Sequence, residues 1–148
     1  IGSEEGLLAI FIHSIVFAFI MVTLMQFWKK LVKIPVIWII DDSLEDQSLM
    51  LRSLEGKRYK VKCFSSPKGL HVQMAMNKPA AVIADYKLSG YTIDGDRVFK
   101  FCARHHIPVT IVTGYDGEIK DIDPSMIIKK STPNFYKDLH NWLSSVVK

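Results

Sequence analysis

The chain begins with one long apolar block and then changes to short apolar runs separated by polar segments. The block, residues 7–28, reads LLAIFIHSIVFAFIMVTLMQFW and contains no Asp, Glu, Lys, Arg, Pro or Gly. At about 1.5 Å per residue, roughly 22 residues form a helix of about 33 Å, which is long enough to cross the hydrocarbon core of a bilayer. The block therefore predicts a transmembrane helix.

The charges that flank this block predict its orientation. Glutamates lie in the preceding segment 1–6, and lysines lie in the following segment 29–35. Because basic residues concentrate on the cytoplasmic side of membrane helices, the C-terminal part is expected in the cytoplasm, with Trp28 at the interface. A cleaved signal peptide would have a basic start and a small-residue cleavage site, and neither is present. The alternative is a very hydrophobic helix buried in an oligomer interface.

Five shorter apolar runs, each bounded by turn residues, follow the basic linker at 29–35. They predict β-strands at residues 36–40, 59–64, 80–84, 108–112 and 126–128. The third and fourth runs are continuously apolar, as expected for strands that are buried on both faces of a sheet.

Helical patterns alternate with these strands. They cover residues 44–55, 68–76, about 96–105 and 133–147. Ser43 and Asp46 predict a capping box for the first of these helices, and Gly56 predicts its end. Thr132 as N-cap and Pro133 at the first helical position predict the start of the last. Alternating strands and helices indicate an α/β fold whose parallel sheet is covered on both faces.

Composition and charge narrow the functional classes. The 148 residues carry a formal net charge of +4, and the basic residues are scattered. Such a distribution suits a domain near an anionic membrane surface, and it lacks the dense basic stripe of a nucleic-acid-binding protein. Cys63 and Cys102 lie far apart without the spacing of a metal site, so they are predicted to be buried free thiols of a reducing compartment.

Candidate chemistry collects where the predicted strands end. The residues that follow strands one, three, four and five are Asp41, Asp42, Asp85, Thr113, Lys129 and Lys130. Because the carboxyl ends of parallel strands meet at one edge of a sheet, these side chains are expected to line a single rim. Three neighbouring carboxylates repel one another unless a cation compensates them, which predicts a Mg²⁺ site. The same set of residues is compatible with an aspartate that accepts a phosphoryl group.

Four motifs, in this order, resemble the receiver domain of bacterial two-component response regulators. They are IIDDS, VIADYKLSGYTIDG, IPVTIVTGY and IIKKSTP, which begin at residues 39, 82, 107 and 127. Over residues 36–148 the resemblance implies a flavodoxin-like, doubly wound five-stranded parallel sheet of strand order 2-1-3-4-5, and the one transmembrane helix predicted from the apolar block precedes it. The predicted organisation is a flank at 1–6, the helix at 7–28, the linker at 29–35 and a receiver domain at 36–148.

The resemblance also implies a metal site and a phosphoacceptor. Asp85 would accept the phosphoryl group. Asp41 and Asp42 would hold Mg²⁺ together with Asp85 and the backbone carbonyl of Lys87.

Two further residues would respond to phosphorylation. Thr113 would hydrogen-bond the phosphoryl group and move inward when it arrives, while a lysine pairs with the phosphoryl oxygens. Lys130 is preferred to Lys129 for this pairing because the lysine directly precedes the serine in the KSTP ending of many receivers.

Several positions depart from the receiver pattern. The connection between the fourth and fifth strands leaves room only for a short helix, which Pro124 is expected to interrupt. Ile127 stands where an aromatic residue often accompanies the switch threonine, and Ser89 stands where a proline is common. Tyr91 and Tyr115 are candidates to frame the mouth of the site. These departures predict an atypical signalling surface.

The expected function is a single-pass protein of the bacterial inner membrane with its receiver domain in the cytoplasm. A histidine kinase or phosphotransfer protein would phosphorylate it, and it would regulate a downstream protein by contact, with no nucleic-acid partner. It would not be an enzyme beyond its own phosphorylation and dephosphorylation. The alternative is a phosphorylation-independent pseudo-receiver that serves as a docking module. A nucleotide-binding or phosphatase enzyme is disfavoured, because DDSLEDQ lacks the glycines of a phosphate-binding loop.

Overall fold

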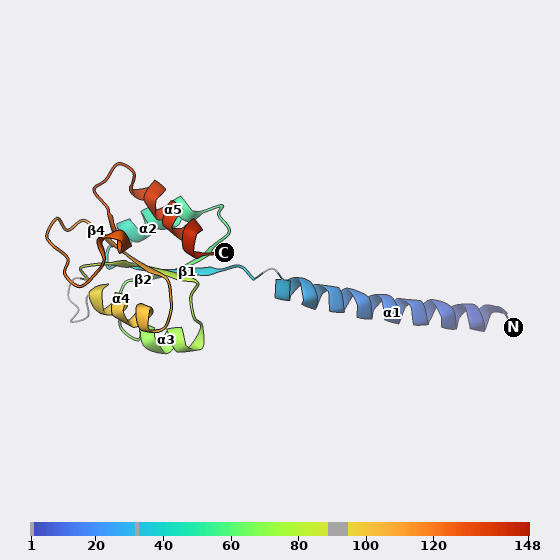
Figure 1. The fold of residues 1–148 in the computed structure, drawn as a ribbon. Coiled ribbons are helices and arrows are strands. Elements are labelled where there is room, and N and C mark those ends of the chain that lie inside the picture. Colours follow the sequence, from blue (N-terminus) through green and yellow to red (C-terminus); the bar gives the residue numbers. More distant parts are fainter. Residues whose placement is uncertain (1, 32, 89–94) are drawn as a thin grey trace. The chain divides into compact units, whose positions relative to one another are not determined.

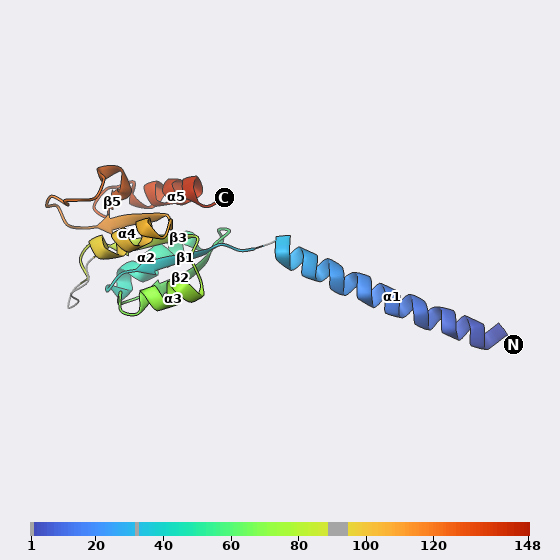
Figure 2. The same ribbon diagram turned by 60° about the horizontal axis from the view of Figure 1, so that its bottom comes forward.

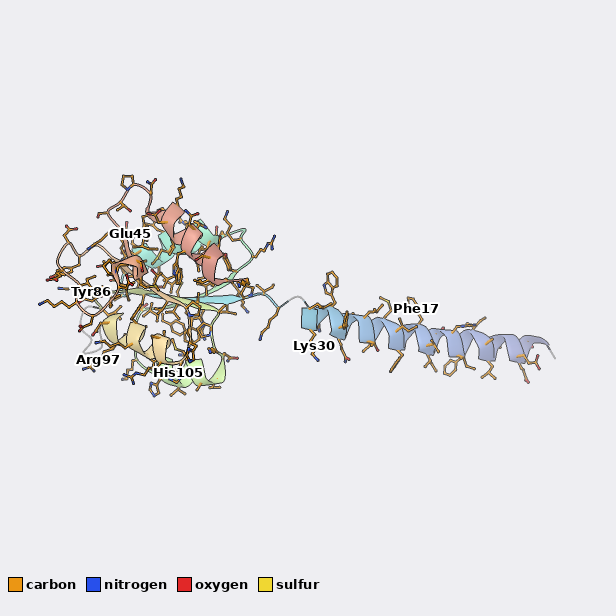
Figure 3. All side chains as sticks on the ribbon, viewed as in Figure 1. Phe17, Lys30, Glu45, Tyr86, Arg97 and His105 are labelled. Atoms are coloured by element: carbon orange, nitrogen blue, oxygen red, sulfur yellow. The ribbon has the colours of Figure 1, made fainter. Side chains whose placement is uncertain are left out.

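The computed structural model describes residues 2–31, 33–88 and 95–148. The chain divides into two units, Ile1–Lys33 and Ile34–Lys148. The first unit is one helix, α1 (Gly2–Leu31), whose described side chains are all exposed. Figure 3 shows these side chains, Phe17 among them, projecting from the helix. A contiguous apolar surface of this size requires an apolar partner, and the helix is long enough to span a membrane.

Polar groups within α1 bond to the helix itself. The Ser14 hydroxyl donates to the carbonyl of Ile10 (2.9 Å), and the Thr23 hydroxyl donates to that of Phe19 (2.8 Å). These bonds reduce the cost of placing a hydroxyl in a hydrocarbon environment.

The second unit is built on a five-stranded sheet. The strands are β1 (Val36–Ile40), β2 (Lys60–Phe64), β3 (Ala81–Asp85), β4 (Val109–Thr113) and β5 (Ile127–Lys129). All pairings are parallel, and the spatial order is β2-β1-β3-β4-β5. The predicted flavodoxin-like order is therefore confirmed. Every residue of β4 and the first four of β3 are buried, which confirms that these central strands are covered on both faces.

Helices cover both faces of the sheet (Figures 1 and 2). On one face, α2 (Leu44–Leu54) and α5 (Phe135–Val146) bury apolar side chains against the sheet. On the other face, α3 (Leu70–Met76) and α4 (Gly95–Arg104) do the same. The sheet thus separates two apolar cores, as in other doubly wound folds.

Two predicted helix starts require correction. Helix α5 begins at Phe135 with Asn134 at its N-cap position, because the Thr132 hydroxyl instead donates to the carbonyl of Lys129 (3.0 Å). Helix α3 begins at Leu70, after Gly69 in the left-handed region (φ 74°). By contrast, Ser43 caps α2 as predicted, since its hydroxyl accepts the Asp46 amide hydrogen (3.2 Å).

The connection between β4 and β5 contains less helix than expected. Within residues 114–126, all of which the structure describes, the regular element is a single 3-10 turn, η1 (Pro124–Met126). Pro124 begins this turn rather than interrupting a helix, and the Asp123 carboxylate caps it by accepting the Ser125 amide hydrogen (2.9 Å). The edge of the sheet at β5 therefore lacks the helix that would ordinarily follow β4.

Candidate functional site

Three carboxylates converge at the carboxyl edge of the sheet. Asp41 and Asp42 follow β1, and Asp85 is the last residue of β3, the neighbouring strand. One carboxylate oxygen from each lies within 4.8 Å of the other two. This spacing suits a hard divalent cation with oxygen ligands, because the cation would compensate the mutual repulsion of the three groups.

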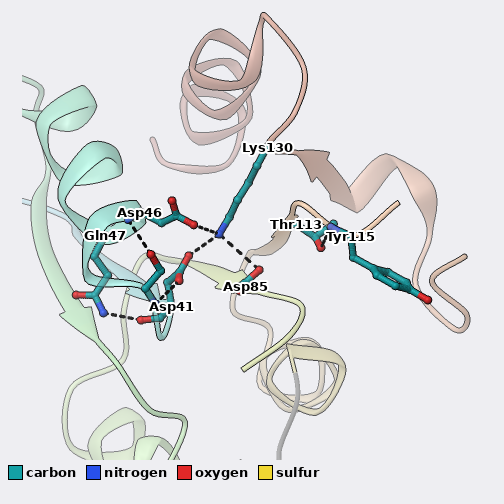
Figure 4. Close-up of polar contacts among 8 residues, drawn as sticks. Asp41, Asp46, Gln47, Asp85, Thr113, Tyr115 and Lys130 are labelled. Atoms are coloured by element: carbon teal, nitrogen blue, oxygen red, sulfur yellow. Dashed lines mark hydrogen bonds and ion pairs between the residues drawn. The ribbon is translucent and has the colours of Figure 1, made fainter. Parts of the chain in front are cut away.

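Lys130 brings a positive charge to the same place. Its ammonium lies 2.7 Å from Asp41, 2.6 Å from Asp46 and 3.6 Å from Asp85, as Figure 4 shows. The side chain is only 18% exposed. Burial alone would lower the pKa of Lys130, but the hydrogen bonds to Asp41 and Asp46 outweigh it, so its pKa is raised and the group stays charged.

Lys129 has a different environment. Its ammonium donates to the backbone carbonyl of Tyr115. The two adjacent lysines thus diverge, and of the pair it is Lys130 that faces the carboxylates. Lys129 is the last residue of β5 and Lys130 is the first residue after it, where the chain turns toward α5.

Asp41 is the most enclosed member of the site. Its side chain is 0% exposed, and it accepts the Ser43 amide hydrogen (2.8 Å) besides pairing with Lys130. The Gln47 side chain donates to the Asp41 carbonyl and to the Ser65 hydroxyl (3.0 Å), which ties the loop after β1 to the loop after β2. The Ser43 amide and the Lys130 ammonium therefore hold the Asp41 carboxylate in one position.

Asp85 is the carboxylate whose protonation the site perturbs most clearly. Burial raises its pKa to about 6, and the neighbouring charges of Asp41 and Asp42 add to the increase. Lys130 and the Tyr86 amide act in the opposite direction. At neutral pH Asp85 is still mainly ionised, and a nearby cation would favour that form further.

A glycine allows α4 to begin directly against the end of β3. The Gly95 amide donates to the Tyr86 carbonyl (2.9 Å), and a Cβ atom placed on Gly95 would lie 2.2 Å from the Asp85 carbonyl oxygen. Only glycine fits so close an approach of two backbone segments. This packing holds the backbone of the candidate phosphoacceptor.

Thr113 and Tyr115 form a second group beside the carboxylates. Thr113 is almost fully buried, and its hydroxyl accepts the Tyr115 amide hydrogen (2.9 Å). The Tyr115 ring stacks on that of Tyr86 at a centroid distance of 6.0 Å, and the Lys87 ammonium lies 4.3 Å from the Tyr115 centroid. Tyr115 is 40% exposed, and its role at the mouth of the site stays a prediction. The proposed role of the Lys87 carbonyl stays a prediction.

Two of the positions singled out in the sequence, Ser89 and Tyr91, lie outside the described residues. Ile127 does lie at the start of β5, where it packs against the core shared with α3 and α4. It presents no aromatic ring toward the site, so an aromatic switch at that position is excluded by the residue itself.

Asp46 is a member of the charged group that the sequence did not reveal. It was expected to complete a capping box, but its carboxylate accepts a hydrogen bond from Lys130 (2.6 Å), and the Ser43 amide bonds to Asp41 instead. The only available signal was its position one helical turn after the Asp41–Asp42 pair. That signal is indistinguishable from the ordinary preference for acidic residues in the first turn of a helix.

Replacing Asp46 by Asn should lower the free energy of unfolding by about 1 kcal/mol at neutral pH, because a partly exposed, charge-assisted contact to Lys130 is lost. The matched control is Glu45→Gln, which removes the same charge from the same helical turn and should cost about 0.3 kcal/mol through the helix dipole alone. Urea unfolding followed by tryptophan fluorescence measures both. Equal losses would mean that the Asp46–Lys130 contact contributes nothing beyond the dipole.

Comparison with known proteins identifies the fold of the second unit. No protein-family model matches the sequence, and no curated protein matches it. Solved structures do match the second unit. The bacteriophytochrome response regulator AtBRR is 19% identical with a TM-score of 0.59, covering 77% of this chain and 93% of its own. The Francisella response regulator 1452 receiver domain is 15% identical with a TM-score of 0.62, covering 76% of this chain and 95% of its own.

A third match is RcsB from Salmonella enterica serovar Typhimurium, solved bound to promoter rprA in the presence of phosphomimetic BeF3−. It is 21% identical with a TM-score of 0.62, covering 76% of this chain and 61% of its own. At these identities the likeness establishes the fold alone. The second unit has the fold of response-regulator receiver domains.

Proposed function

We propose that the chain is a membrane-tethered receiver that accepts a phosphoryl group on Asp85. The observation that carries the proposal is the convergence of Asp41, Asp42 and Asp85 within 4.8 Å, with the Lys130 ammonium 3.6 Å from Asp85. Alone, an acidic cluster has little specificity. Combined with a partly buried lysine, a nearby threonine and the receiver fold, it supports aspartyl phosphorylation.

The donor set fits Mg²⁺. Carboxylates of Asp41, Asp42 and Asp85 lie close enough together to share one ion, and the Lys87 backbone carbonyl would supply a further oxygen. When bound, the ion would provide positive charge beside the transferred phosphoryl group. Without that charge, the three carboxylates would repel the anionic phosphoryl group of an incoming donor.

The protein's own residues would act on the acceptor and on the product. An Asp85 carboxylate oxygen would attack the phosphorus of the donor, forming the O–P bond as the bond to the donor's leaving group breaks. Lys130 needs only a small movement to pair with the phosphoryl oxygens, since it already lies between Asp85 and Asp46. Asp41 is fully buried and bonded to the Ser43 amide, so its carboxylate would stay in place when Lys130 moves toward the phosphoryl group.

Thr113 could pass the event to the surface. In the structure the Thr113 hydroxyl accepts the Tyr115 amide hydrogen. A phosphoryl oxygen on Asp85 would be a charged acceptor to which the same hydroxyl could donate its proton. If Thr113 rotates toward the phosphoryl group, the Tyr115 bond is broken. Tyr115 and the segment that follows it, which lacks a helix, would then carry the change to a partner protein.

The membrane tether rests on α1. Its exposed apolar side chains and its length support insertion in a bilayer, and a histidine kinase or phosphotransfer protein would be the phosphodonor on the cytoplasmic side. In a bacterium this location is the inner membrane. The chain would regulate its partner by contact, without catalysing another reaction.

Incubating the full chain in detergent with acetyl phosphate and Mg²⁺ should add one phosphoryl group, observed by intact-protein mass spectrometry. Excess EDTA should abolish the addition, because the carboxylates would be left uncompensated. Hydroxylamine should remove the group, since it cleaves acyl phosphates. No mass increase at any Mg²⁺ concentration would favour the phosphorylation-independent docking module, whose face would be the short β4–β5 connection.

A further inference from the structure

The unit 34–148 also carries a basic surface at the edge of the sheet opposite the acidic site. Helices in this fold run antiparallel to the strands, so the ends of the helices lie beside the starts of the strands. Backbone hydrogen bonds show the alignment: the Lys60 amide donates to Pro35 (2.9 Å), the Ala80 amide to Val36 (2.8 Å) and the Val82 amide to Pro108 (2.8 Å). Segments 55–60, 77–80 and 104–108 therefore share one edge with the entry of the chain into β1.

This edge, which we call the basic edge, is rich in cations. In segments 55–60, 77–80, 104–108 and 147–148 the exposed cationic residues are Lys57, Arg58, Lys60, Lys78, Arg104 and Lys148. Glu55 is the exposed acid of the same segments, and His105 and His106 lie there too. In Figure 3, His105 lies toward this end of α4 and Tyr86 toward the other end of the domain.

Helix dipoles do not account for this charge. Cations are favoured in the last turn of a helix, but Lys57, Arg58 and Lys78 lie beyond the ends of α2 and α3. Met76 is 75% exposed beside them. The opposite edge bears the carboxylate site and the exposed acids that follow the end of β4, Asp116 and Glu118. The exposed cations of the basic edge and the carboxylate site therefore lie at opposite ends of the strands.

We infer that the basic edge binds anionic lipid headgroups, an inference that rests on the membrane insertion of α1 in the proposed function. Four residues separate Leu31 at the end of α1 from Val36 at the start of β1. The five steps from Leu31 to Val36 span at most about 18 Å when fully extended, so the strand that enters the sheet at the basic edge begins close to the bilayer surface. Lys29, Lys30 and Lys33 follow the apolar block in the sequence and would lie at the same membrane surface in the proposed tether.

The tether makes a modest attraction sufficient. Each lysine or arginine near an anionic surface contributes a small attraction that acts within about 8–10 Å at physiological salt. Covalent attachment holds the basic edge at an effective concentration in the millimolar range, so no high intrinsic affinity is needed. Docked in this way, the domain presents the opposite, acidic edge to the aqueous phase, where a phosphodonor protein approaches.

The test is hydrogen–deuterium exchange of the full chain in nanodiscs of phosphatidylcholine, with and without 30% phosphatidylglycerol. Peptides covering 55–60, 77–80 and 104–108 should exchange about threefold or more slowly in the anionic discs, and 0.5 M NaCl should remove the difference. Lys57→Glu, Arg58→Glu and Lys78→Glu together should also remove it. The matched control, Lys68→Glu, Lys120→Glu and Lys137→Glu, changes three exposed lysines elsewhere and should retain it.

Equal exchange in the two disc compositions overturns the inference, as does slowing that appears only with added RNA or an acidic protein. The salt comparison needs no variant, so misfolding of the triple substitution cannot obscure the result.

The proposed function is tested by separate measurements on the same chain. Phosphoryl incorporation on Asp85 tests the receiver activity, and resistance to alkaline carbonate extraction tests the tether. Extraction of the chain would overturn both the tether and lipid docking, whereas equal exchange in an inserted, phosphorylatable chain overturns lipid docking alone.

Discussion

Asp85→Asn should abolish phosphoryl incorporation from acetyl phosphate and, in the absence of Mg²⁺, should make the domain more stable at neutral pH. The first effect follows because the amide is not a nucleophile. The second follows from burial, which raises the Asp85 pKa to about 6. Between about pH 4 and pH 6 the folded state binds more protons at this group than the unfolded state, so the free energy of unfolding falls as the pH rises.

The variant lacks this titration. Above pH 6 in EDTA it should exceed the wild type by about 2 kcal/mol, and the difference should shrink to a few tenths of a kcal/mol near pH 4, where the wild-type carboxyl is protonated in the folded state and about half protonated in the unfolded state. Mg²⁺ should reverse the order by stabilising the wild type selectively. Urea unfolding between pH 4 and pH 8 measures the difference. Asp116→Asn, which removes an exposed carboxylate from the same edge of the domain, should match the wild type in both assays. Retained phosphorylation in Asp85→Asn would assign the acceptor to another residue.

Lys130→Met should destabilise the unit 34–148 by about 2–3 kcal/mol at neutral pH without Mg²⁺. Lys130 lies within 3.6 Å of Asp41, Asp46 and Asp85, and Asp41 is fully buried. Removing the Lys130 ammonium takes away the cation that pairs with this buried carboxylate, which is the costly way to break a buried ion pair. Because Lys130 also lowers the Asp85 pKa, its loss should raise that pKa further. Added Mg²⁺ should recover part of the stability.

The adjacent residue provides the control. Lys129→Met deletes the same charge one position earlier, where the ammonium donates only to the Tyr115 carbonyl at the exposed rim, and it should cost less than about 0.5 kcal/mol. Phosphorylation should separate the two variants in the same way, with incorporation slowed about tenfold or more in Lys130→Met and within about twofold of the wild type in Lys129→Met. The reverse ranking would assign the phosphate-pairing role to Lys129.

Much of the fold could be predicted because its local signals agree with its tertiary structure. The continuous apolar runs that became β3 and β4 could be satisfied only by burial on both faces, and Ser43 and Gly56 mark the ends of α2 by backbone requirements. The predicted start of α5 was wrong. The Thr132 hydroxyl donates to the carbonyl of Lys129, and α5 begins at Phe135 without a side-chain capping hydrogen bond from Asn134.

The amino-acid sequence by itself determined the alternation of strands and helices, the apolar N-terminal helix and the presence of acidic residues at the ends of β1 and β3. These follow from periodicity and composition, which act over a few neighbouring residues. Only the tertiary structure decided that Asp46 joins the carboxylate group and that Tyr115 is tied to Thr113 and Lys129; the choice of Lys130 over Lys129 was indicated beforehand only by the resemblance of KKSTP to receivers. The Lys130 contacts join residues that lie 89 and 84 positions apart, and the Lys129–Tyr115 contact depends on the register of β5 beside β4, so no pattern of neighbouring residues specifies them.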